Sequence, residues 1–99
     1  MRGMRWRRRV PQVQVVTRHV CHLCQEMVRV VEDAAGASVP VTTLDLDAAL
    51  ASGELDEGKH ARWTTLVPVL LVDGREVAHL HADKGLVRRA LRRSRPADR

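Results

Sequence analysis

The spacing of hydrophobic residues changes several times between residues 10 and 91, and each change marks a new predicted element. Val10–Thr17 is rich in valine and has a proline near its start, which is typical of a strand. From His22 onward apolar residues recur every three or four positions, as on one face of an amphipathic helix. Gly36 ends this helix, and partial alternation over Val39–Leu46 predicts a second strand.

The next segment, Ala48–Trp63, has a weaker pattern because it contains two glycines, Gly53 and Gly58. Each glycine costs a helix about 1 kcal/mol relative to alanine. We therefore expect a short or broken helix in this segment, with Asp47 as the cap at its start.

A β-hairpin is predicted around Asp73-Gly74, which separates the strand-like runs Val69–Val72 and Glu76–Leu80. The Asp-Gly pair favours a type I′ turn, since both central residues of that turn need a positive φ. Asp83 is then expected to cap a final amphipathic helix.

The predicted order of elements is βαβαββα. A strand, a crossover helix and a second strand imply a right-handed parallel unit, and the hairpin adds an antiparallel pair. The fold class is therefore expected to be α/β, with a four-stranded mixed sheet covered by helices. Ninety-nine residues are enough for one such domain and leave no room for a second core, so we expect a single domain over residues 10–93.

Charge is distributed unevenly along the chain. There are 17 Lys and Arg residues and 12 Asp and Glu residues, which give a formal net charge of +5. Eleven arginines lie in residues 1–9 and 88–99, so Val10–Val87 retains six basic residues against eleven acidic ones. We expect residues 1–9 and 94–99 to be basic, flexible tails on an acidic domain.

This distribution argues against several classes of protein. Nucleic-acid modules interleave bases with stacking aromatics, whereas Trp6 and Trp63 are the only aromatic residues here besides histidine. The apolar run Val67–Val72 has only six residues and includes a proline, so no membrane span is expected. The arginine-rich start lacks the apolar stretch of a secretory signal. We therefore expect a cytoplasmic monomer without a specific nucleic-acid or membrane partner.

Cys21 and Cys24 stand where the first predicted strand gives way to the first predicted helix. The unpaired N–H groups and dipole of a helix N-terminus stabilise a thiolate, and Cys-x-x-Cys thiols can have a pKa lowered from about 8.5 to roughly 3.5–7.5. Cys21 is then a nucleophile at neutral pH, and Cys24 is the more enclosed thiol that resolves a mixed disulfide. In a cytoplasmic protein, such a pair favours catalytic or metal chemistry over a structural disulfide.

A second hypothesis is a metal-binding or redox-sensing module that uses the same thiols to hold zinc or copper. The ligands would come from Cys21, Cys24, His19, His22, His79 and His81. A closed zinc site needs a second pair of ligands beside the cysteines. His79 and His81 project from one face of one predicted strand, which need not be the face toward the cysteines. Redox chemistry is therefore preferred, and no bound metal is expected.

From about residue 12 to residue 91 the chain resembles the small bacterial glutaredoxin-like proteins of the thioredoxin-like superfamily. The resemblance rests on the strand ending Val15-Val16-Thr17-Arg18, on Cys21-His22-Leu23-Cys24 opening a helix, and on Val67-Pro68 leading into Val69-Leu70-Leu71-Val72-Asp73-Gly74. It implies a thioredoxin-like fold and thiol-disulfide oxidoreductase activity. It also implies a cis peptide bond before Pro68, in a loop that packs against the active sulfurs.

The resemblance further implies which residues bind the substrate. Arg18, three residues before Cys21, has the place of the family's basic residue that meets the glycine carboxylate of glutathione. Positive charge on Arg18 and His22 would also tune the sulfur. A cis bond before Pro68 would leave the backbone of Val67 free to pair with an extended peptide or with glutathione.

The expected partners are protein disulfides and a thiol reductant, and no resident cofactor is expected. Candidate electron donors are glutathione, a mycothiol-type thiol and thioredoxin reductase. Cys-His-Leu-Cys replaces the family's Cys-Pro-Tyr-Cys, so dithiol exchange is better supported than glutathione as the partner.

Residues outside these motifs have structural interpretations. Trp63 is expected to pack in the core or to shield the site, because a lone tryptophan in a small domain is more often buried than functional. Met27 is expected to fill the core. Asp45 and Asp47 are assigned to a strand-end cap and a solvated acid rather than to a general-base pair.

Overall fold

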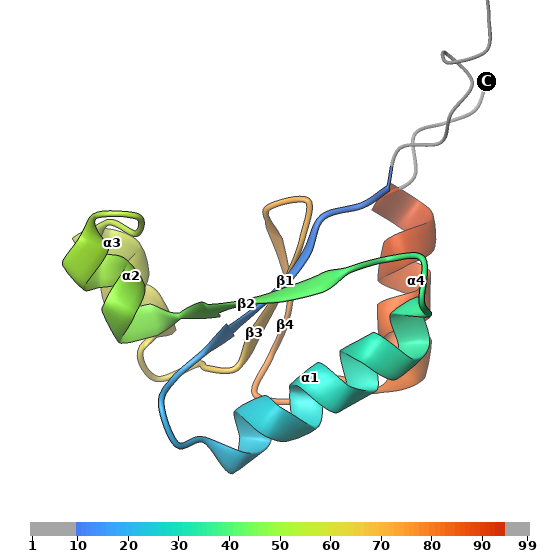
Figure 1. Ribbon diagram of the computed structural model, residues 1–99, viewed down its shortest axis with the longest axis horizontal. Coiled ribbons are helices and arrows are strands. Elements are labelled where there is room, and N and C mark those ends of the chain that lie inside the picture. The colour runs from blue at the N-terminus through green and yellow to red at the C-terminus, as the bar shows by residue number, and fades with distance from the viewer. Residues whose placement is uncertain (1–9, 95–99) are drawn as a thin grey trace, which may run out of the picture.

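The computed structural model describes residues 10–94, which form strands and helices in mixed order (Figure 1). In chain order they are β1 (Val13–Thr17), α1 (His22–Ala35), β2 (Val41–Asp45), α2 (Leu46–Ser52), α3 (Glu57–Trp63), β3 (Val69–Val72), β4 (Arg75–His79) and α4 (Lys84–Ser94). The predicted order is confirmed, and the expected broken helix forms α2 and α3. Helix α4 extends to Ser94, one residue beyond the predicted domain boundary, and the rest of both predicted tails lies outside the described residues.

The four strands form one mixed sheet in the order β2-β1-β3-β4. Strand β1 runs parallel to β2, with Val13 opposite Val41, and antiparallel to β3, with Val13 opposite Val72. Strand β4 pairs antiparallel with β3 and forms one edge of the sheet. This is the thioredoxin-like α/β arrangement that the sequence predicted. It places the carboxyl ends of β1 and β2 at the same end of the sheet, where α1 begins.

Alternation along the strands divides the core between the two faces of the sheet. Val15 of β1 packs with Met27 of α1 on one face, and α1 and α4 lie side by side there (Figure 1). Val16 points to the other face, where it packs with Leu46 and Trp63 of the α2–α3 segment. Met27 and Trp63 are therefore core residues, as predicted. Because both faces are covered, all four residues of β3 are buried.

Helix α2 begins two residues earlier than the sequence pattern predicted. Asp45, not Asp47, is its N-cap, and the Asp45 carboxylate accepts a hydrogen bond from the N–H of Ala48 at 2.9 Å. Gly53, with φ of 84°, ends α2, and Asp56 caps α3. Among the helices of residues 10–94, none combines the length and hydrophobicity needed to cross a lipid bilayer.

The hairpin between β3 and β4 has the predicted turn. Asp73 and Gly74 have φ of 51° and 82°, as a type I′ turn requires. Strand β4 ends at His79, so His81 lies outside the strand on which it was predicted, beyond Leu80 with its positive φ of 67°. Asp83 caps α4 as expected, accepting from the N–H of Leu86 at 2.9 Å.

Glu76 of β4 joins the hairpin to α3. Its carboxylate accepts two hydrogen bonds from the Arg62 guanidinium, at 2.9 and 2.8 Å, and one from the indole N–H of Trp63 at 2.9 Å. His79 Nε2 lies 2.9 Å from the same carboxylate. The guanidinium, the imidazole and the indole N–H all favour the charged form, and they hold the pKa of Glu76 well below its usual value. This cluster fixes α3 against β4.

Candidate functional site

Cys21 is the N-cap of α1, at the point where the chain leaves β1 and enters the helix. Its backbone is extended, with φ of −139° and ψ of 109°, and its Sγ accepts a hydrogen bond from the N–H of Cys24 at 3.2 Å. No acidic residue lies in the first turn of α1. The sulfur therefore lies where the partial positive charge of the helix N-terminus is greatest and no neighbouring carboxylate offsets it.

Cys21 and Cys24 are joined by a disulfide, and their Cα atoms lie 5.2 Å apart. Cys24 is only 3% exposed, whereas Cys21 is half-buried. The difference follows from position, because Cys24 is one turn into the helix and faces the sheet, while the cap residue lies at the surface. An incoming thiolate therefore reaches the sulfur of Cys21 first.

Val67 and Pro68 lie at the same edge of the sheet as the cysteine loop, because Val16 near the end of β1 pairs with Val69. The Val67-Pro68 bond is cis, as the sequence resemblance implied. The Val67 N–H was expected to be free for a bound peptide, but it donates to the carbonyl of Trp63 at 3.0 Å. Val67 closes the end of α3 in this way, so a docked chain would have the Val67 carbonyl, and not its N–H, to pair with.

Arg18 was expected to meet the carboxylate of a substrate, but its guanidinium is bonded within the protein. Its Nε lies 3.1 Å from a carboxylate oxygen of Asp47. Its Nη1 and Nη2 donate to the carbonyl and hydroxyl of Thr64, at 3.0 and 2.7 Å. Arg18 therefore ties the loop before Cys21 to α2 and to the end of α3, and in this structure it is a positioning residue.

Asp47 was expected to be a solvated acid; it is exposed as expected, but it is also paired with two other side chains. It accepts from Arg18 and lies 2.8 Å from His60 Nε2. These two hydrogen bonds lower the pKa of Asp47 from 3.8 to about 2. No local pattern could have identified this cluster, because Asp47 is 29 residues from Arg18 and 13 from His60.

The cluster predicts how stability depends on pH. A carboxylate whose pKa is depressed on folding stabilises the folded state above its unfolded pKa, and this contribution disappears as the pH falls through the folded pKa. Asp47→Asn is therefore expected to be less stable than the wild type near pH 6, and the gap is expected to close between about pH 4 and about pH 2. Urea denaturation at several pH values measures the gap.

Glu54→Gln provides the control for this experiment. Glu54 is an exposed carboxylate that makes no ion pair within residues 10–94. The difference in free energy of unfolding between Glu54→Gln and the wild type should vary little over the same pH range. A stability gap for Asp47→Asn that stays constant from pH 6 to pH 2 would contradict the assigned role of this carboxylate.

The two histidines beside the cysteines, His19 and His22, are both exposed. His22 is the first residue of α1, so its imidazole is near the disulfide in sequence but points to solvent. Among the described residues neither histidine has a hydrogen-bond or ion-pair partner.

The metal hypothesis required a second set of ligands close to the cysteines. No group of three or more His, Cys, Asp or Glu side chains within residues 10–94 is arranged to hold a metal ion. Of the two distant histidines, His79 is bonded to Glu76 and His81 is exposed beyond the end of β4. The described residues therefore do not fit a closed zinc or copper site.

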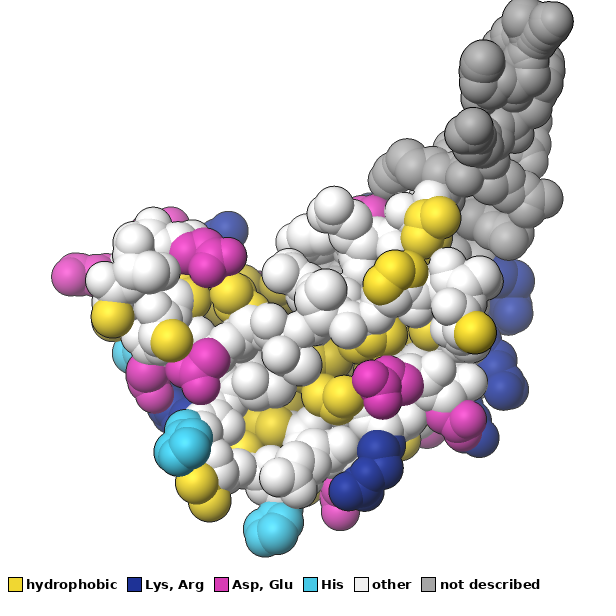
Figure 2. All heavy atoms as spheres, viewed as in Figure 1, with side chains coloured by type: hydrophobic (Ala, Val, Ile, Leu, Met, Phe, Trp, Pro, Cys, Tyr) yellow, Lys and Arg dark blue, Asp and Glu magenta, His cyan; other side chains and the backbone are white. Residues whose placement is uncertain are grey.

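A groove of about 380 Å³ opens beside the disulfide, between α1 and the carboxyl ends of β1 and β2. We call it the cysteine groove, and its lining residues are Thr17, Arg18, Val20, Cys21, Cys24, Gln25, Val28, Arg29 and Thr43. Hydrophobic side chains are visible in the hollowed face between α1 and β2 (Figure 2). In open α/β sheets ligands bind outside the carboxyl ends of the strands, and this groove has that position.

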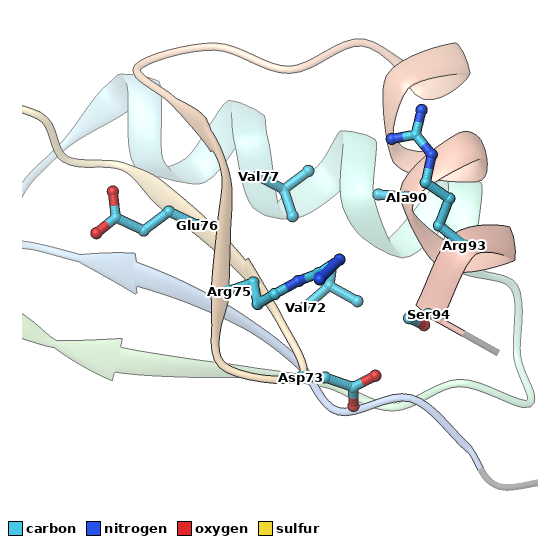
Figure 3. A pocket seen from close by; sticks show the side chains of 8 residues that line it. All are labelled: Val72, Asp73, Arg75, Glu76, Val77, Ala90, Arg93 and Ser94. Atoms are coloured by element: carbon cyan, nitrogen blue, oxygen red, sulfur yellow. The ribbon is translucent and has the colours of Figure 1, made fainter. Parts of the chain in front are cut away.

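A larger cavity, of about 530 Å³, lies between β4 and α4 (Figure 3). It is bordered by Arg75 and Asp73 at the hairpin and by Arg93 at the end of α4. The Asp73 N–H bonds to Gln12, which precedes β1, whereas the cysteines follow the end of β1. The cavity therefore lies at the end of the sheet where β1 begins, opposite the disulfide, and neither sulfur lines it.

The fold and the disulfide at a helix N-terminus define this chain as a thioredoxin-like α/β protein with a Cys-x-x-Cys site. No model of a known protein family matches it. It is 35% identical over 88 residues to Uncharacterized protein Rv0508 of Mycobacterium tuberculosis and to Uncharacterized protein Mb0520 of Mycobacterium bovis, with 85% of this chain and 86% of each relative covered. The chain belongs to the family of these mycobacterial proteins, whose names state no activity.

Proposed function

We propose that this protein is a thiol-disulfide oxidoreductase of glutaredoxin-like type, with Cys21 as the nucleophile and Cys24 as the resolving thiol. The observation that carries the proposal is the position of the Cys21 sulfur at the N-cap of α1, where the Cys24 N–H donates to it. Backbone N–H groups at a helix N-terminus stabilise a thiolate, and the thiolate is the reactive form of cysteine. The burial of Cys24 beneath it supports the division of roles.

The reaction proceeds in two exchanges that balance in atoms and electrons. The Cys21 thiolate attacks one sulfur of the substrate disulfide, the substrate S–S bond breaks, and the departing thiolate takes up a proton from water. The Cys24 thiolate then attacks the Cys21 sulfur, which releases the second substrate thiol and forms the Cys21–Cys24 disulfide. The substrate gains two electrons and the protein loses two. A thiol reductant returns them by attacking Cys21, the more accessible sulfur.

Protein disulfides are the proposed substrates. Glutathione or a mycothiol-type thiol is the proposed class of reductant, because either would attack the half-buried Cys21 sulfur from solvent. A cytoplasmic, monomeric bacterial protein without a resident metal or cofactor fits this chemistry, since a reducing compartment keeps such a dithiol available.

The rate at which iodoacetamide alkylates Cys21, measured against pH on the reduced protein, tests the proposal. The expected midpoint lies within roughly 3.5–7.5, below the value of about 8.5 for a free thiol. The measurement is best made on Cys24→Ser, which leaves Cys21 as the sole thiol and keeps the backbone N–H that donates to it. A midpoint close to that of a free thiol would remove the basis for a stabilised nucleophile.

A further inference from the structure

Arg29 lies on the wall of the cysteine groove and has no ion-pair partner among residues 10–94. Three other basic residues of the domain are paired with acids: Arg18 with Asp47, Arg62 with Glu76, and Lys84 with Asp33. Arg29 makes no hydrogen bond or ion pair with any residue that the structure describes, and it is exposed. It lies on α1, eight residues after Cys21.

The remaining lining of the groove also favours an anion. None of its lining residues within the described part of the chain is a carboxylate, although acidic residues outnumber basic ones over Val10–Val87. Thr17 and Thr43 contribute hydroxyl groups and Gln25 contributes an amide, all of which can donate to an oxygen atom. The positive end of the α1 dipole lies at the same groove, at Cys21. The charge at the lining of the groove therefore comes from Arg18, which is paired with Asp47, and from Arg29.

We propose that the cysteine groove selects protein disulfides that carry an Asp or Glu close to the reacting cysteine, with Arg29 binding that carboxylate. This inference rests on the proposed oxidoreductase function and specifies its substrate class. Guanidinium groups bind carboxylates with two parallel hydrogen bonds, so an unpaired arginine at a binding groove suits this role. Val20, which is 84% exposed at the groove, offers an apolar contact to neighbouring substrate residues.

Helix geometry fixes where the acidic residue should be. Eight residues of helix separate Cys21 from Arg29 by about 12 Å along the axis. Long helical side chains lean toward the helix N-terminus, which brings the guanidinium several ångström closer to the sulfur. An extended chain advances about 3.3 Å per residue, so the carboxylate should lie two or three residues from the reacting substrate cysteine.

The test compares three synthetic peptide disulfides that are identical except at one position. This position lies two residues from the reacting cysteine and carries Asp, Asn or Lys. The expected wild-type kcat/KM is about fivefold higher for the Asp peptide than for the Lys peptide, given the modest strength of an exposed ion pair. Arg29→Gln should abolish this preference and Arg29→Glu should reverse it. Arg92→Gln, which removes an exposed charge on α4 outside the groove, should retain the preference.

The outcomes separate the two proposals. If the wild type does not prefer the Asp peptide over the Lys peptide, or if Arg29→Gln keeps that preference, the role of Arg29 is overturned. Reduction of the peptides would still support the oxidoreductase function in that case. Failure of the wild-type protein to reduce any of the three peptides would overturn the oxidoreductase function and the inference that rests on it. A reversed preference in Arg29→Glu, with the Asn peptide unaffected, would establish charge recognition.

Discussion

Cys21→Ser is expected to reduce no disulfide above the rate of buffer alone, whereas Cys24→Ser is expected to stop at the mixed disulfide. The serine hydroxyl does not ionise near neutral pH, so the first exchange has no nucleophile. In Cys24→Ser the first exchange proceeds, but without an added thiol reductant nothing attacks the Cys21 sulfur to release the substrate. Insulin reduction with excess thiol measures the first loss, and intact mass of the protein after incubation with a peptide disulfide detects the trapped adduct.

The same experiment separates an oxidoreductase from a metal-binding module. Wild-type turnover that disappears in Cys21→Ser, in protein that contains no metal by elemental analysis, favours the enzyme. Stoichiometric zinc or copper together with no turnover would favour the module instead. Adduct formation at Cys24 in the Cys21→Ser variant would contradict the assignment of roles, because Cys24 is 3% exposed.

Trp63→Ala is expected to destabilise the protein by about 3–5 kcal/mol, the usual range when a buried large aromatic residue is truncated. Trp63 is 4% exposed and packs with Val16, Leu46 and Val69 on the α2–α3 face of the sheet. Truncation leaves a cavity there and removes the indole N–H that donates to Glu76. Chemical denaturation followed by circular dichroism measures the loss.

Trp63→Phe is the matched variant, because it keeps most of the apolar volume and loses the hydrogen bond. Its expected cost is smaller, and Glu76 keeps its bonds to Arg62 and His79. A cost below about 1 kcal/mol for Trp63→Ala would contradict the place given to this residue in the core. Equal costs for the two variants would assign the effect to the hydrogen bond instead.

The parts of the fold that were predicted correctly depend on residues close together in sequence. Asp73-Gly74 specifies its turn by the φ that its two residues can adopt, and the period of α1 is visible over four turns. The position of Cys21 at a helix start follows from the change of pattern around it. Local chemistry is sufficient for each of these features.

The errors arise where two local choices compete or where distant residues meet. Asp45 and Asp47 are both good N-cap residues, and the choice between them depends on Leu46 being buried in the core. Asp47 is then available to bind Arg18 and His60. Tertiary structure alone decides such pairings, and for this reason the bonds of the Arg18 guanidinium to Asp47 and Thr64 were not predicted.

The hydrogen bond from the Val67 N–H to the Trp63 carbonyl limits the number of backbone hydrogen bonds that this loop could make to a bound polypeptide. Facing residues of adjacent antiparallel strands can exchange two main-chain bonds, one in each direction. Residue 67 can complete at most the one that its carbonyl accepts. Backbone hydrogen bonds do not depend on the sequence of a bound polypeptide, and this loop can offer fewer of them. The lifetime of a complex at the Cys21 sulfur would therefore depend more on side-chain contacts, which favours selectivity between polypeptides over general affinity.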